Sequence, residues 1–235
     1  MTHDGRRRAI LAIDTATTRV VIATGTPGGV ADGVSTWTAG YRHGEYLLSS
    51  IGRFLGEQNI RRSRLVGIVV GTGPGAFTGL RVGIATAKGL AHGLGIPLVG
   101  VSTAEALIEA FEAVEGADTR TVLLLPAGRS DRIVVRAGTP PVSLSAGEEP
   151  DLASGERLVA VDLDGRAPDD AVARGETARA GLGQALLRAG AARLAQITAD
   201  GPATSKLETL VPDYVTLPRG VRATTGTVEW SRDPR

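Results

Sequence analysis

The segment Gly71-Thr72-Gly73-Pro74-Gly75-Ala76-Phe77-Thr78-Gly79-Leu80-Arg81 has the residue types of an anion-binding turn. It lies between an apolar run of strand length and a helical pattern. A glycine-rich turn at the start of a helix exposes backbone amides and the positive end of the helix dipole, which can hold a phosphate or a carboxylate. The alternative is a tight turn whose glycines let strand and helix pack closely. The residues alone favour neither interpretation.

Two nucleotide motifs can be tested against this segment. Neither of its last two glycines is followed by the lysine that a P-loop requires, which excludes that motif. Gly71, Gly73 and Ala76 fit the dinucleotide pattern, but that pattern needs an acidic residue about 20 positions later, at the end of the next strand. Here that strand ends in Val101-Ser102-Thr103, so dinucleotide binding is disfavoured.

A second candidate for chemistry is Asp14, which begins the polar turn Asp14-Thr15-Ala16-Thr17-Thr18 between two apolar runs. A carboxylate in such a hairpin can act through Mg²⁺ while backbone amides hold phosphates. From spacing alone, an ordinary hairpin whose Asp satisfies its own turn is the favoured interpretation. The two segments together define a candidate vestigial nucleotide or anion site of Asp14, Thr15, Gly73, Gly75 and Thr78.

The elements that position these residues follow from hydrophobic periodicity. The order predicted up to residue 115 is three strands, a helix, a strand, a helix, a strand and a helix. Because a strand, a crossing helix and a strand follow one another, the strands at 65–71 and 96–101 should be parallel. The predicted ranges are 9–13, 20–24, 30–39, 44–58, 65–71, 76–93, 96–101 and 103–115.

The pattern weakens after Arg120. Strands are expected at 121–125, 132–137 and 157–162, and a helix at 177–196. A shift in composition near 116–120 indicates a lobe boundary close to residues 100–118. We therefore predict an N-terminal lobe at 1–101, a C-terminal lobe at 102–218 and a flexible tail at 219–235.

The composition excludes several classes of protein. There are 26 basic and 25 acidic residues among 235, so any RNA role must rest on a local patch or on a partner. The chain has no cysteine, which removes disulfides, thiolate nucleophiles and cysteine zinc sites. The basic residues are nearly all arginine, which we attribute to a GC-rich genome rather than to a phosphate-binding surface. No stretch is typical of a secretory signal or a membrane span, so a cytoplasmic protein is expected.

No catalytic set can be drawn from spacing. The three histidines are His3, His43 and His92, which are too scattered for a metal site. No Ser-His-Asp set and no pair of catalytic carboxylates is recognisable.

Several segments of the chain closely resemble the TsaB family, also called YeaZ. They are the turn at 14–18, the glycine-rich segment at 71–81, Gly89-Leu90-Ala91, Ile96-Pro97 and Val99-Gly100-Val101-Ser102-Thr103. The resemblance is dense from residue 9 to about 107. It implies an α/β fold of the actin-like ATPase and sugar kinase (ASKHA) class, with two related lobes, each a mixed sheet with helices.

The family is the non-catalytic subunit of the bacterial complex that makes threonylcarbamoyladenosine next to the anticodon of tRNAs that read codons beginning with A. The resemblance implies that the chain binds and activates the catalytic subunit TsaD, with the ATPase TsaE as a third protein. It implies tRNA contact only through the complex, and no membrane. No cofactor would be required by this subunit, whereas ATP or ADP and Mg²⁺ would act at the level of the complex.

The position of the catalytic relative's metal pair supports a non-catalytic subunit. In the catalytic subunit TsaD, the segment that matches Val101 to Leu107 carries a His-x-x-x-His metal pair on a helix. The corresponding residues here are Thr103 and Leu107, which cannot form that site, because an aliphatic side chain is no ligand and one hydroxyl is a poor one. We therefore expect no metal site.

In the family, the helices matching 44–58 and 76–93 pack against the equivalent helices of the catalytic subunit; the sequence does not decide whether the chain alone forms a homodimer through them. The second helix is apolar around much of its surface, and small residues at Gly79, Gly83 and Ala87 would allow another helix to approach. The alternative is that this face packs on the chain's own sheet, and the resemblance favours a helix that is covered on two sides. The expected interface residues are Leu47, Leu48, Ile51, Leu80, Gly83, Ile84, Ala87 and Ala91.

Departures from the family pattern lie in the second half. Where the family often has a strand that ends in Asp-Ala-Arg, this chain has Pro126-Ala127-Gly128-Arg129. The family's Pro-x-Tyr-Leu-Arg ending survives only in part, as Pro212-Asp213-Tyr214-Val215-Thr216.

The alternative function is a small-molecule kinase or ATPase of the same fold, which would use Asp14 and the 71–79 loop. Proteolysis is disfavoured by the absence of a nucleophile set and a metal pair.

Overall fold

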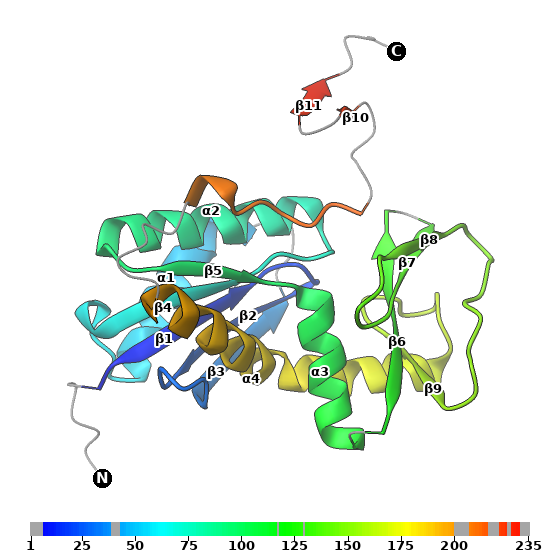
Figure 1. The fold of residues 1–235 in the computed structure, drawn as a ribbon, viewed down its shortest axis with the longest axis horizontal. Coiled ribbons are helices and arrows are strands. Elements are labelled where there is room, and N and C mark those ends of the chain that lie inside the picture. Colours follow the sequence, from blue (N-terminus) through cyan, green and yellow to red (C-terminus); the bar gives the residue numbers. More distant parts are fainter. Residues whose placement is uncertain are drawn as a thin grey trace.

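The computed structural model describes residues 7–38, 43–116, 118–128, 130–199, 207–215, 221–224 and 227–230. Figure 1 shows a large five-stranded sheet with helices on both faces and, beside it, a smaller four-stranded sheet. The predictions that involve residues 1–6, residues 200–206 or the side chain of His43 fall outside the described residues.

The first sheet has the strand order β3-β2-β1-β4-β5. β1 is antiparallel to β2, which is antiparallel to β3, while β4 lies parallel to β1 and to β5. The predicted parallel pair is thus confirmed. The bounds are Ala9–Asp14, Arg19–Gly25, Ala31–Thr38, Leu65–Gly71 and Leu98–Val101 for β1 to β5.

Helices α1 (His43–Glu57) and α2 (Phe77–Leu94) cover one face of this sheet. Their apolar sides form a core with the side chains of β1, β2 and β4 that point to that face. The other face packs against α4 (Asp169–Ala199), and α3 (Thr103–Glu115) packs against α4 and β6 within the same core cluster. Because the sheet is covered on both faces, β1 and β4 are apolar at nearly every position instead of alternating.

The second sheet has the order β8-β7-β6-β9 and repeats the arrangement at the centre of the first. β6 is antiparallel to β7 and parallel to β9, as β1 is to β2 and β4. Two related lobes with mixed sheets are therefore present. The bounds are Arg120–Ala127, Asp131–Val135, Val142–Leu144 and Glu156–Ala160 for β6 to β9.

The long helix α4 joins the lobes. It contacts β9 of the second sheet and β1, β2, β4 and β5 of the first, and it packs along α3. One core cluster consequently includes Val69 of the first sheet, Val159 of the second and Leu186 of α4. The sequence predicted only 177–196 of this helix, because its first two turns, Asp169-Asp170-Ala171-Val172-Ala173-Arg174-Gly175-Glu176, have few apolar positions.

Short elements complete the fold. The 3-10 helices are η1 (Arg62–Arg64), before β4, and η2 (Leu207–Thr209). Within the predicted tail, β10 (Val221–Thr224) and β11 (Thr227–Trp230) pair as an antiparallel hairpin, so this part of the tail has regular structure.

Over the described residues, no helix is both long and apolar enough to span a membrane.

The contact between α4 and β9 gives a test of the fold. A Cβ at Gly175 would lie 1.9 Å from the carbonyl oxygen of Ala160, so backbone must move to admit any side chain. We expect Gly175→Ala to lower the free energy of unfolding by about 2–3 kcal/mol. The matched control is Gly89→Ala in α2, where a Cβ would meet nothing within 4 Å, and helix propensity should raise stability by about 0.5–1 kcal/mol. Urea denaturation of both variants measures the difference, and equal effects would contradict the packing described.

Candidate functional site

Asp14 ends β1 inside the protein, with no solvent exposure. One carboxylate oxygen accepts a hydrogen bond from the Thr103 hydroxyl at 2.6 Å, and the other accepts from the Ala16 amide at 2.9 Å. A Cβ at Gly71 would lie 1.8 Å from the Asp14 carboxylate, so the neighbouring strand must carry glycine there. Burial raises the pKa of Asp14 to about 6, although the bonds from Thr103 and Ala16 act in the opposite direction.

The glycine-rich segment packs directly on this hairpin. The Thr15 hydroxyl donates to the carbonyl oxygen of Gly79 at 2.7 Å, and the Ala76 amide donates to that of Ala16 at 2.7 Å. A Cβ at Gly75 would lie 2.1 Å from the oxygen of Ala16. One at Gly79 would lie 2.1 Å from the Thr15 carbonyl oxygen, and one at Gly83 would lie 2.1 Å from the Thr15 hydroxyl. These contacts support the close-packing interpretation of the motif.

The predicted site residues therefore separate into different environments. Asp14, Thr15 and Gly73 are buried, Gly75 is half-buried at the edge of a cleft, and Thr78 is exposed on the first turn of α2. Asp14 and Thr15 direct their polar atoms to partners within the chain. A single ligand cannot touch all five residues in this conformation.

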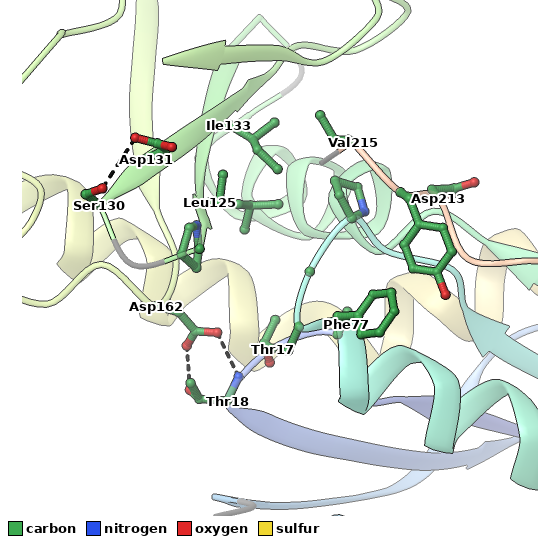
Figure 2. A pocket seen from close by; sticks show the side chains of 18 residues that line it. Thr17, Thr18, Phe77, Leu125, Ser130, Asp131, Ile133, Asp162, Asp213 and Val215 are labelled. Carbon is green, nitrogen blue, oxygen red and sulfur yellow. Dashed lines mark hydrogen bonds between the residues drawn. The ribbon is translucent and has the colours of Figure 1, made fainter. Parts of the chain in front are cut away.

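A cleft of about 620 Å³ lies between the lobes, bounded by the hairpin, the start of α2, β6, β7 and the C-terminal segment. Figure 2 shows Thr17, Thr18 and Phe77 on the first-lobe side and Leu125, Ile133 and Asp131 on the second-lobe side. Asp162 and Asp213 also line it, and the described lining residues include no lysine, arginine or histidine. The cleft is thus acidic.

Asp162 joins the two lobes at the floor of this cleft. Its carboxylate accepts a hydrogen bond from the Thr18 amide at 2.7 Å and another from the Thr18 hydroxyl (Figure 2). The same carboxylate pairs with Arg179 of α4, and both side chains are only 8% exposed. Asp162 has a positive φ of 59°, a backbone conformation that aspartate tolerates better than most residues. No motif in the sequence pointed to this link, since Thr18 and Asp162 are 144 positions apart.

Residues 213–215, at the end of the segment 207–215, form another wall of the cleft. Asp213 is bonded twice to Thr72: its amide donates to the Thr72 carbonyl at 2.8 Å, and its carboxylate accepts from the Thr72 hydroxyl at 2.5 Å. The Tyr214 ring lies 5.2 Å from that of Phe77, and its hydroxyl accepts from Arg81 Nε at 3.1 Å. These contacts hold Pro212-Asp213-Tyr214, the part of the family's ending that this chain retains, against the glycine-rich turn.

The positions that match the catalytic relative's metal pair serve packing here. Thr103 donates its hydroxyl to Asp14, and Leu107 is fully buried in the core between the sheets and α4. Among the described residues, no three His, Cys, Asp or Glu side chains are grouped to hold a metal ion. His92 is exposed on α2.

The predicted interface residues need correction. Leu47, Ile51, Leu80, Ile84, Ala87 and Ala91 are at most 4% exposed, and Gly83 faces Thr15, so all seven are covered by the chain's own hairpin and core. The apolar face of α2 is the one that packs on the sheet. Of the eight residues, only Leu48 lies on the surface, at 58% exposed.

Comparison with known proteins identifies the fold and then the family. The structure of YeaZ from Pseudomonas aeruginosa superposes with a TM-score of 0.63 at 22% identity, covering 88% of this chain and all of that one. The protein is therefore a two-lobed α/β protein with the YeaZ fold, which confirms the expected fold class.

Residues 26–210 match the family model described as TsaD, tRNA N6-adenosine threonylcarbamoyltransferase, and the chain belongs to this family. An uncharacterised protein of Mycobacterium leprae is 42% identical over 42% of this chain and 28% of its own length. The TsaB protein of Escherichia coli, a tRNA threonylcarbamoyladenosine biosynthesis protein, is 36% identical over 40% of each chain. The matched part spans less than half of these two relatives.

The buried carboxylate predicts a pH dependence of stability. Since the folded pKa of Asp14 is about 6 and its ordinary value is 3.8, the folded state binds more protons than the unfolded state between these values. Stability due to this group therefore falls as the pH rises from about 4 to about 6. Asp14→Asn should remove that slope, because the amide does not titrate.

Urea denaturation at pH 4.5 and 7.5 measures the effect. Asp164→Asn, at an exposed position on the loop after β9, is the control and should keep the wild-type dependence. An unchanged slope in Asp14→Asn would show that the carboxylate is not buried as described.

Proposed function

We propose that the chain acts in the biosynthesis of tRNA threonylcarbamoyladenosine as a partner subunit that binds and activates the catalytic subunit TsaD. The observation that carries this proposal is the use of Thr103 and Leu107 for packing. Thr103 holds the buried Asp14 and Leu107 fills the core, so the positions of the relative's metal pair have lost that chemistry on a retained fold. The relative from Escherichia coli, a tRNA threonylcarbamoyladenosine biosynthesis protein, supports the assignment to this biosynthesis.

The pairing surface we propose is the outward face of α1 and α2. Tyr46 and Leu48 of α1 are large apolar residues that are 52% and 58% exposed. On α2, Ala85, Gly89 and Gly93 are exposed at intervals of four, and a Cβ at either glycine would meet nothing within 4 Å. Small residues on one ridge allow a second helix to approach closely, and the apolar side chains of α1 would lose water in the contact.

A variant on this ridge tests the pairing. Gly89→Arg adds a bulky charge in open space, so the chain should stay folded while its affinity for the TsaD protein of the same organism falls at least tenfold. Ala113→Arg, an equivalent change at an exposed position of α3, is the control and should bind as wild type. Calorimetric titration of TsaD into each variant measures the affinity. Equal binding by Gly89→Arg and wild type would contradict this surface, and a stable pair of identical chains sensitive to Gly89→Arg would assign it to a homodimer instead.

The alternative function, a kinase or ATPase, receives less support from the cleft. Asp162 already occupies the Thr18 amide, where a phosphate would have to bind, and the described lining residues add the carboxylates of Asp131 and Asp213. The carboxylates of Asp131 and Asp213 oppose the approach of a phosphate that is not bound to Mg²⁺. The Asp14 carboxylate is enclosed by its own hydrogen bonds and cannot reach a ligand in this conformation.

Calorimetry of the isolated chain with Mg-ATP separates the two functions. We expect no saturable heat at millimolar nucleotide, because the hairpin amide and the carboxylates oppose phosphate binding. Tight binding with turnover of an acceptor would favour the kinase and contradict the role proposed here.

A further inference from the structure

Arginines from three separate parts of the chain lie toward the amino end of the first sheet. β1 and β4 run parallel, with Ala9 beside Leu65, so the residues that precede both strands lie at the same edge of the sheet. Arg7 and Arg8 precede β1, and Arg64 precedes β4. The register of two strands therefore joins sequence positions more than fifty residues apart.

Helix α1 and η1 extend this group. A Cβ at Gly52 of α1 would lie 3.5 Å from the guanidinium of Arg62, so η1 folds back over α1. Arg53 of α1 is next to that contact, and its side chain is 74% exposed. The arginine patch, as we define it, comprises Arg7, Arg8, Arg53, Arg61, Arg62 and Arg64, of which all but the half-buried Arg64 are exposed.

The patch keeps a positive charge. Two of its members have described ion pairs, Arg7 with Asp32 and Arg53 with Glu57, the latter at 3.8 Å on a well-exposed helix surface. The acidic groups Asp131, Asp162 and Asp213 line the cleft, which adjoins the hairpin and the start of α2, beyond the carboxyl end of β1 and β4. The net charge of +1 therefore conceals a separation of charge along the sheet.

The surroundings of the patch indicate the kind of partner. The six side chains of the patch are all guanidinium groups, and the exposed apolar Leu48 lies beside the patch, one turn before Gly52 on α1. The patch itself therefore has neither the apolar centre of a protein interface nor the apolar anchors of a membrane-binding surface. Guanidinium groups bind phosphate through paired hydrogen bonds, and a row of them fits a polyanion with regularly spaced phosphates.

We propose that the arginine patch binds the phosphate backbone of tRNA directly. This inference rests on the proposed function, since it assigns a contact to the substrate RNA of the same complex. Arg53 and the exposed Leu48 both lie on α1, so the patch borders the proposed pairing surface. A tRNA held by TsaD would therefore reach this subunit without crossing its acidic cleft.

The test is tRNA binding by the full chain, alone and with TsaD, followed by fluorescence anisotropy between about 50 and 200 mM salt. The test variant is Arg61→Glu with Arg62→Glu, two exposed positions whose change should leave the core intact. The control is Arg120→Glu with Arg157→Glu, which makes the same change of charge at exposed positions of the second lobe.

We expect the patch variant to bind tRNA about tenfold more weakly at low salt, with a salt slope smaller by about two, while the control changes less than threefold. The thermal unfolding midpoint and the affinity for TsaD should stay those of wild type. Equal losses in both double variants would overturn the proposal, as would wild-type tRNA binding by the patch variant.

Two further arms complete the test. Vesicles rich in anionic phosphatidylglycerol replace tRNA in the first, and binding to vesicles without binding to tRNA would assign the patch to a lipid surface. In the second, TsaD is omitted, so loss of pairing and loss of RNA binding are measured separately. Failure to pair with TsaD would refute the proposed function, whereas tRNA binding that ignores Arg61 and Arg62 would refute only this inference.

Discussion

The structure of the first lobe depends on the enclosure of one carboxylate, that of Asp14. This group lies at the end of the central strand, so everything that surrounds it must either donate a hydrogen bond or leave room. Thr103 at the start of α3 and the amide of Ala16 donate, while Gly71 on the next strand leaves room. An unpartnered charge at such a site would be strongly destabilising. The carboxylate thus ties the turn after β1 to the start of α3.

The hairpin built on Asp14 also explains where the glycines of α2 are needed. Thr15 and Ala16 approach the helix so closely that side chains at Gly75, Gly79 and Gly83 would overlap them. The same spacing of small residues, considered as a sequence pattern, predicts an approachable outer helix surface. Packing on the hairpin uses the inner stripe, and the exposed Ala85, Gly89 and Gly93 form a second stripe on the opposite side. One helix therefore carries two ridges of small residues with different neighbours.

The relation between the lobes rests on α4 and on the link from Thr18 through Asp162 to Arg179. The helix continues the core from one sheet to the other, and the ion pair at its side is almost fully enclosed. Asp162 consequently orients the second lobe against the hairpin and occupies the Thr18 amide. The acidic cleft and the arginine patch at the other end of the sheet have opposite charges, which the balanced composition does not reveal.

The sequence by itself determined the elements of the first lobe up to residue 115 and the family. Long apolar runs such as Leu65–Gly71 and the helical pattern around α2 are local signals, and the glycine-rich segment is specific enough to indicate relatives. Local periodicity shows that one side of α2 is apolar, but it cannot show what covers that side. The sequence pattern therefore predicts a partner contact for Ile84 and Ala87, although the chain's own core buries them. The bond from Thr18 to Asp162, the bonds between Asp213 and Thr72 and the pairing of Ala9 with Leu65 were decided by the tertiary structure alone. They join residues that only strand register and helix packing bring together, and no spacing along the chain encodes such distances.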